Sequence, residues 1–149
     1  MDGGAPGLET PVDPTGVLLV VAVLAAGTAF GLYRRRTDGR VVGSPSGPRL
    51  TAADLGADLG PRATLVQFSS AFCQPCRATR QVLDDVAGQV EGVSHVEIDA
   101  EARLELVRRL DILRTPTVLV LDQEGCVVRR ASGQPRKADV IAALGHAVS

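Results

Sequence analysis

The clearest chemical signal in this sequence is a pair of cysteines separated by two residues. Cys73 and Cys76 belong to the run Phe72-Cys73-Gln74-Pro75-Cys76, which follows the apolar stretch of residues 63–68. A strand that leads into a helix would place Cys73 at the helix N-terminus, where unpaired backbone N–H groups and the helix dipole favour a thiolate. Cys76 would lie one turn deeper on the same face, within reach of a short disulfide. The spacing therefore predicts thiol–disulfide exchange, with Cys73 as the nucleophile and Cys76 as the resolving thiol.

Two other interpretations of the cysteine pair stay open at this point. A C-x-x-C pair can form half of a zinc site, but the other candidate ligands, Cys126, His95 and His146, are not paired at ligand spacing. Two merely structural thiols are the second alternative, although such residues are seldom spaced C-x-P-C between a strand and a helix. We favour the redox interpretation and expect neither a metal nor an organic cofactor.

Length and composition are those of one ordinary globular domain with an appendage. The chain has 149 residues, of which 45% are hydrophobic and 22% are charged. Its net charge of −1, its single tyrosine and its lack of tryptophan argue against a nucleic-acid surface. Three cysteines are an odd number, so they do not make a disulfide framework by themselves. Nucleic acid is therefore not expected as a partner.

An uncharged stretch near the N-terminus predicts a membrane helix. Residues 16–33 read GVLLVVAVLAAGTAFGLY and are followed by Arg34, Arg35 and Arg36. At about 1.5 Å per residue, this stretch covers nearly the hydrocarbon thickness of a bilayer. A cleaved signal peptide is the main rival, because residues 25–29 are small, but such a peptide begins with basic residues. The residues before the stretch carry only acidic charges, so we expect an uncleaved anchor; a buried apolar helix is the remaining alternative.

The charges beside this stretch also predict its orientation. All nearby basic residues lie on its C-terminal side, and basic residues are retained in the cytoplasm. We therefore expect a short extracytoplasmic segment at residues 1–15, a single-pass anchor at 16–33 in the cell membrane, and a cytoplasmic domain. A reducing compartment would keep the cysteine pair mainly as a dithiol and make the domain a reductant.

The rest of the chain divides into a linker and a folded domain. Residues 34–48 are basic at first and then rich in glycine, serine and proline, which predicts a short, mostly extended tether. Residues 49–149 alternate between helical and strand patterns. The predicted helices cover residues 51–60, 73–90, 101–110 and 135–144, and the predicted strands cover 63–68, 93–98, 117–121 and 126–130, with a hairpin turn at 122–125. This order predicts an α/β domain with a sheet covered by helices on both faces.

The order of elements and four motifs resemble the thioredoxin family over about residues 49–148. The motifs are Cys73-x-Pro75-Cys76, Thr115-Pro116 at the family's cis-proline, Gly125 in the hairpin turn and Gly133 before the last helix. The resemblance implies a thioredoxin-like fold with a central mixed β-sheet flanked by helices. It also implies that the cis-proline loop lies beside the disulfide, and that the backbone of Thr115 pairs with an extended substrate. The implied substrate contacts are Phe72, Gln74, Pro75, Thr115 and Pro116.

Three departures from the family pattern limit what the resemblance implies. Phe72 replaces a tryptophan before the first cysteine, and Gln81 replaces a proline that kinks the helix. Gln67 replaces the buried aspartate that helps to take a proton from the resolving thiol, and His95 aligns with the lysine often paired with that aspartate. Losing both charges together is consistent, because a lone buried charge is costly. Gln67 and His95 are the candidates for proton handling, with a purely structural role as the alternative for His95.

The sequence as a whole predicts a membrane-tethered protein-disulfide reductase. Its partners would be protein disulfides and an electron donor, which the resemblance suggests is a thioredoxin reductase or a membrane thiol reductant. A domain that faced the opposite side of the membrane would instead maintain extracytoplasmic thiols. A non-catalytic module that binds a partner at the membrane is the third alternative.

Overall fold

The computed structural model describes residues 13–37, 39–43 and 47–149. They belong to two compact units, one ending at Arg36 and the other running from Thr37 to Ser149, and each unit is described by itself. Most of the predicted extracytoplasmic segment lies outside the described residues. The cysteine pair and the sheet both belong to the second unit.

The first unit contains one long apolar helix, α1, which spans Pro14–Thr37. Asp13 caps this helix by accepting a hydrogen bond from the Thr15 N–H at 3.1 Å. The large apolar side chains of the helix are exposed. By length and composition alone, the stretch Pro14–Arg36 is able to cross a membrane, and it contains the predicted span 16–33.

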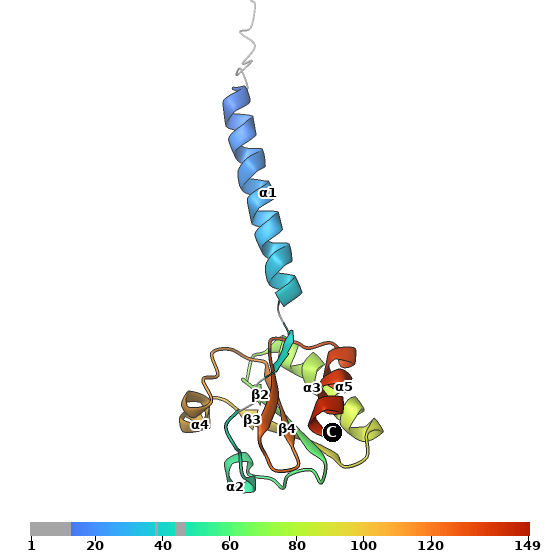
Figure 1. The fold of residues 1–149 in the computed structure, drawn as a ribbon. Helices are drawn as coiled ribbons and strands as arrows, with labels where there is room; N and C mark the ends of the chain where they lie inside the picture. Colours follow the sequence, from blue (N-terminus) through green and yellow to red (C-terminus); the bar gives the residue numbers. More distant parts are fainter. Residues whose placement is uncertain (1–12, 38, 44–46) are drawn as a thin grey trace, which may run out of the picture. The chain divides into compact units, whose positions relative to one another are not determined.

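The second unit is built on a five-stranded mixed sheet (Figure 1). Its strand order is β1-β5-β4-β2-β3, and the interior strand β2 runs parallel to β3 and antiparallel to β4. The strands are β1 (Val41–Gly43), β2 (Ala63–Ser69), β3 (Val93–Asp99), β4 (Thr117–Asp122) and β5 (Val127–Ser132). Every residue of β2 is buried, as expected for an interior strand with helices on both faces.

Helices cover both faces of this sheet (Figure 1). They are α2 (Ala52–Leu55), α3 (Gln74–Gln89), α4 (Leu104–Arg109) and α5 (Lys137–Ala147). On one face, Leu65 of β2 packs in a core with Leu83 of α3 and Leu144 of α5. On the other face, Phe68 of β2 belongs to a core that includes Leu55 of α2. Leu65 and Phe68 are an odd number of residues apart, so the alternation of a strand sends them to opposite faces.

Most of the predicted elements are present, and the differences have local causes. α2 ends at Leu55 rather than near residue 60, because Gly56 adopts a left-handed backbone with φ 69° that closes the helix. α4 begins at Leu104 rather than at residue 101, because the Asp99 carboxylate accepts a hydrogen bond from the Glu101 N–H at 2.9 Å and holds a turn there. The predicted mixed sheet flanked by helices is confirmed.

The predicted linker over residues 34–48 differs from the structure at its start and in its middle. Its first residues belong to α1, and Val41–Gly43 form β1, which pairs antiparallel with β5. The Gly39 N–H already donates to the Ser132 carbonyl at 2.9 Å, so attachment to the sheet begins before the strand itself. Two adjacent valines favour a short edge strand. The glycine, serine and proline residues around them gave the segment the composition of a linker, so the strand was not predicted.

Candidate active site

Cys73 caps the N-terminus of α3, the helix that begins at Gln74. Its backbone is extended (φ −94°, ψ 99°), and its Sγ accepts a hydrogen bond from the Cys76 N–H at 3.2 Å. The two cysteines are joined by a disulfide with an S–S distance of 2.08 Å. Cys73 is half-buried, whereas Cys76 is only 3% exposed. Cys73 is therefore the more exposed of the two cysteines.

The loop before β4 lies beside the loop that leads into the disulfide. The peptide bond between Thr115 and Pro116 is cis, as the resemblance implied. The hydroxyl oxygens of Thr115 and Ser70 are 3.0 Å apart, so a hydrogen bond joins the cis-proline loop to the segment before Cys73. Because β2 and β4 are antiparallel neighbours, the last residues of β2 and the first residues of β4 lie at the same end of the sheet. The structure thus brings together motifs that are far apart in the sequence.

Two large apolar side chains near these loops are exposed. Phe72 is 100% exposed, and Leu113, two residues before Thr115, is 85% exposed. Gln74 and Pro75 are also exposed. Exposed apolar side chains gathered near a reactive group favour contact with an apolar segment of a partner. Sequence analysis named Phe72 but missed Leu113, although an apolar residue in the loop before a Thr-Pro motif was an available signal.

Gln67 contacts the backbone of the second cysteine and is fully buried. Its Nε2 donates two hydrogen bonds, one to the Cys76 carbonyl and one to the Ser69 hydroxyl, each at 2.8 Å. Both amide hydrogens are therefore used, and its Oε1 has no hydrogen-bond partner within the described ranges. A neutral amide held in this way positions the backbone of Cys76 but supplies no basic group.

The other candidate for proton handling, His95, does not lie opposite Gln67. In the register of β2 and β3, His95 lies opposite Leu65, and its Nδ1 is 2.6 Å from the Asp84 Oδ1 of α3. Asp84 follows Cys76 by eight residues, which is about 12 Å along a helix. This placement supports the structural alternative for His95.

The carboxylate opposite Gln67 is that of Glu97 on β3. An ion pair joins it to Arg80 of α3, with an Nη2–Oε2 distance of 2.6 Å. Burial raises the pKa of Glu97, but hydrogen bonds from Arg80 and Ser69, together with the nearby charges of Arg80 and His95, outweigh burial and hold that pKa below its ordinary value. Glu97 is therefore ionised near neutral pH.

Glu97 extends the hydrogen-bond network beneath the disulfide to the protein surface. The network runs from the Cys76 carbonyl through Gln67 and Ser69 to the Glu97 carboxylate. At the surface it meets a pocket of about 340 Å³, which is lined by Ser69, Ser70, Ala71, Arg80, Glu97 and Asp99. Sequence analysis missed this network, because only the pairing of β2 with β3 brings Glu97 next to Gln67.

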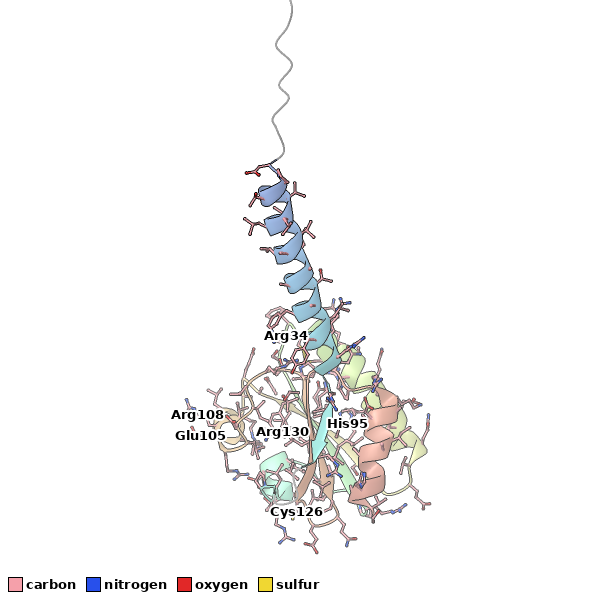
Figure 2. The ribbon with its side chains drawn as sticks, turned by 45° about the horizontal axis from the view of Figure 1, so that its top comes forward. Arg34, His95, Glu105, Arg108, Cys126 and Arg130 are labelled. Atoms are coloured by element: carbon pink, nitrogen blue, oxygen red, sulfur yellow. A yellow bond between two sulfur atoms is a disulfide. The ribbon has the colours of Figure 1, made fainter. Side chains whose placement is uncertain are left out.

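The third cysteine lies apart from the disulfide. Cys126 is free and half-buried, and it follows the turn between β4 and β5 (Figure 2). β4 runs from the cis-proline to this turn, so Cys126 is at the opposite end of the sheet from the cysteine pair. Within the part of the chain that the structure describes, no three His, Cys, Asp or Glu side chains gather as metal ligands. Cys126 therefore does not share a site with the cysteine pair.

Fold and site together define a class of protein. A C-x-P-C disulfide that caps a helix beside a cis-proline loop, on a mixed sheet flanked by helices, is the arrangement of a thiol–disulfide oxidoreductase. Residues 54–146, more than half of the chain, match the family model described as Thioredoxin. The chain belongs to the thioredoxin family.

Named relatives agree with this assignment. A thioredoxin of Mycolicibacterium smegmatis is 29% identical over 87 residues, which are 56% of this chain and 77% of the relative. A bifunctional thioredoxin reductase/thioredoxin of Mycobacterium leprae is 28% identical over 102 residues, which are 66% of this chain but 22% of that relative. Thioredoxin f from spinach chloroplast superimposes with a TM-score of 0.54 at 22% identity, over 60% of this chain and 80% of that one, and so shows a shared fold.

Proposed function

We propose that this thiol–disulfide oxidoreductase works as a protein-disulfide reductase tethered to the membrane. We propose the direction of electron flow, from the cysteine pair to the substrate disulfide, and the location at the membrane. The observation that carries the proposal is the unequal access to the two sulfurs. Cys73 is half-buried at the N-terminus of α3, and Cys76 lies behind it at 3% exposure. Such a pair suits attack by the first thiol and resolution by the second.

The reaction starts with both cysteines reduced. The N-terminus of α3 stabilises the Cys73 thiolate, which attacks one sulfur of a substrate disulfide. A bond forms between Cys73 and that sulfur, the substrate S–S bond breaks, and the released thiolate takes up a proton. Cys76 then loses its proton and attacks the Cys73 sulfur, which forms the internal disulfide and releases the second substrate thiolate. Two electrons pass from the cysteine pair to the substrate.

The exposed residues around Cys73 form the proposed substrate surface. An extended segment of the substrate would pair with the backbone of Thr115 and contact the side chains next to the disulfide. The proposed contacts are Phe72, Gln74, Pro75, Thr115 and Pro116 from the sequence, with Leu113 added from the structure. The hydrogen bond between Thr115 and Ser70 supports this surface, because it fixes the cis-proline loop beside the disulfide loop.

The oxidised pair needs an external electron donor. We assign this part to a thioredoxin reductase, because the relative from Mycobacterium leprae is named as a bifunctional thioredoxin reductase/thioredoxin. A membrane thiol reductant would replace it for a domain outside the cytoplasm.

The membrane location rests on α1. Its apolar length is enough for one span, and Arg34, Arg35 and Arg36 in its last turn favour a cytoplasmic domain by the retention of basic residues. The proposed organisation is an extracytoplasmic segment at residues 1–15, an anchor at 16–33 and a catalytic domain that includes β1.

Reduction of insulin disulfides by the full chain in detergent tests the proposed activity. With dithiothreitol as the donor, we expect the native chain and the Cys126→Ser variant to reduce insulin, and Cys73→Ser to remain at background. A native chain that folds but reduces no more insulin than Cys73→Ser would overturn the proposal and favour the non-catalytic interaction module.

A further inference from the structure

The chain is attached to the sheet almost as soon as α1 ends. α1 runs to Thr37, and the Gly39 N–H already donates to the Ser132 carbonyl of β5. β1 continues this attachment along β5. By chain length alone, the three steps from Arg36 to Gly39 span at most about 11 Å. A free tether over residues 37–48 would have reached about 40 Å.

The attachment point and the redox site share one end of the sheet. Ser132 lies opposite Thr117 of β4, and Thr117 lies opposite Phe68 of β2, close to where the chain continues to Cys73. Neighbouring strands are about 4.8 Å apart, so Gly39 is roughly 15 Å across the sheet from the end of β2. From Phe68 the chain continues to Ser70, whose carbonyl accepts a hydrogen bond from the Cys73 N–H, and this last stretch adds at most about 13 Å. Measured along the chain and across the sheet, the cysteine pair is therefore at most about 40 Å from Arg36.

The surface next to β1 is basic, which favours contact with a bilayer. Arg40, Arg129 and Arg136 line a pocket of about 310 Å³ beside this strand. Asp139, which also lines the pocket, forms an ion pair with Arg136 at 2.8 Å, so Arg40 and Arg129 give the pocket a net positive charge. A basic residue near an anionic membrane surface contributes about 1 kcal/mol of attraction. This charge favours a domain that stays at the membrane.

We propose that the substrates of this enzyme are disulfides that lie within about 40 Å of the membrane surface, in membrane proteins or in proteins bound at the membrane. The inference rests on the proposed anchor and reductase activity, and it adds the substrate class. A disulfide far out in a large soluble domain is beyond the reach of Cys73, because the sheet has taken up the residues of the tether. Phe72 and Leu113 supply exposed apolar contacts for a segment near the bilayer.

Co-reconstitution of the full chain with single-pass reporter proteins tests this inference. Each reporter carries one disulfide, placed either within about five residues of its span or beyond a rigid helical spacer of about 40 residues, which is about 60 Å long. The enzyme is reduced beforehand and the reductant is removed, so one enzyme dithiol reduces one reporter disulfide. Soluble insulin added to the same vesicles measures the chemistry independently of reach.

Two matched insertions distinguish an effect on the distance that Cys73 can cover from an effect on the thiol–disulfide reaction itself. About 30 Gly/Ser residues between Thr37 and Asp38 lengthen the tether by about 30 Å on average. The same insertion between Val12 and Asp13, before α1, leaves the tether unchanged. We expect the native chain and the control insertion to reduce the near reporter at least about 10-fold faster than the far one, and the tether insertion to narrow this ratio to under about 3-fold. Insulin reduction should be equal in all three.

Each contrary result has its own meaning. Equal rates on the near and far reporters with the native chain would overturn the inference and leave the enzymatic activity intact. A chain that reduces neither insulin nor either reporter would overturn the proposed reductase and the substrate class with it. Release of the chain from the vesicles by alkaline carbonate would overturn the anchor, and with it the restriction to membrane substrates.

Discussion

Cys73 and Cys76 carry the same functional group, and their surroundings give them different roles. The helix N-terminus favours the thiolate at Cys73, which is half-buried. The carbonyl of Cys76 is held by Gln67 at 2.8 Å, and its side chain is almost fully buried. A thiol in that position reacts fastest with a sulfur already bound one helical turn away.

The Cys76→Ser variant tests this division of roles. It keeps the attacking thiol but lacks the group that resolves the mixed disulfide, so we expect it to accumulate covalent complexes with substrate while turnover falls to near background. Non-reducing gels of the variant incubated with insulin measure the complexes, which dithiothreitol should release. Cys126→Ser should behave like the native chain in the same assay. Complexes trapped by Cys73→Ser instead would reverse the assignment.

A second prediction concerns Gln67, which supplies hydrogen-bond donors but no base. A carboxylate can accept the proton of Cys76, so we expect Gln67→Asp to speed release of substrate from the mixed disulfide near neutral pH, as measured by stopped flow. The shorter side chain loses the donors to Cys76 and Ser69, and the free energy of unfolding should fall by about 1–3 kcal/mol.

The pH dependence of the stability of the Gln67→Asp variant provides a further check. Burial raises the folded-state pKa of the new carboxyl group above its unfolded value, so the stability loss should grow as pH rises above about 4. Gln123→Asp makes the same change of charge at an exposed turn residue and should show neither effect. An unchanged release rate in Gln67→Asp at pH 7 would show that proton removal from Cys76 does not limit resolution.

Residues whose roles depend on local spacing could be predicted from the sequence, and residues brought together by strand register could not. The motifs Cys73-x-Pro75-Cys76 and Thr115-Pro116 are contiguous, so their placement at a helix N-terminus and at a strand start followed directly. Glu97 becomes the neighbour of Gln67 only through the parallel pairing of β2 with β3. His95, two residues away on the same strand, lies opposite Leu65 instead.

At the scale of secondary-structure elements, α2 shows how strongly a cap can define a short helix. Thr51 and Asp54 form a capping box: the Asp54 Oδ2 accepts from the Thr51 N–H at 2.8 Å, and the Thr51 hydroxyl accepts from the Asp54 N–H at 3.3 Å. Arg109 of α4 adds an ion pair with Asp54 at 2.6 Å. The sequence showed the start of this helix, because the box is a local motif, but its early end depends on the left-handed backbone of Gly56.

The third prediction tests this cap. The Thr51 backbone N–H and the Arg109 guanidinium hold the pKa of Asp54 below its ordinary value. A depressed folded-state pKa stabilises the protein above the unfolded pKa of about 3.9, and this contribution is lost as pH falls through the folded pKa. Asp54→Asn should therefore lower the free energy of unfolding by about 1 kcal/mol at pH 7 and have little effect near pH 2.

Chemical denaturation at the two pH values measures the Asp54→Asn effect. Asp58→Asn is the matched control, because Asp58 is exposed and follows the end of α2. A stability loss that stays the same at both pH values would mean that the charge of Asp54 does not contribute, and that the amide disrupts the cap by its shape.

At the scale of the whole molecule, the edge strand β1 shortens the free chain between the anchor and the domain, and this affects which substrates the domain can reach. A flexible linker would let the domain sample a wide volume, and substrate choice would then depend on the active-site surface alone. Because β1 pairs with β5, only a short length of chain lies between α1 and the sheet. This length limits which substrate disulfides Cys73 can reach, and the surface formed by Phe72, Leu113 and Thr115 selects among them. Short edge strands of this kind are the elements that sequence patterns reveal least, because three residues give no periodicity.

The last prediction is the orientation of the anchor, which decides the compartment in which the cysteine pair works. Arg34, Arg35 and Arg36 adjoin the apolar stretch, and the opposite flank carries only acidic residues, so we expect the C-terminal domain to face the cytoplasm. In a Cys126→Ser background, intact cells treated with a permeant thiol reductant should show no labelling by a membrane-impermeant maleimide. Permeabilised cells should show labelling of the cysteine pair.

A charge-swapped chain provides the control for this orientation. Replacing the three arginines with glutamine and inserting three arginines before Pro14 should invert the protein, because the basic flank then lies on the other side of the same apolar stretch. The inverted chain should be labelled in intact cells, and an alkaline-phosphatase fusion at its C-terminus should be active in bacteria. Labelling of the native chain in intact cells would instead place the domain outside, where the pair would maintain extracytoplasmic thiols and draw electrons from a membrane reductant.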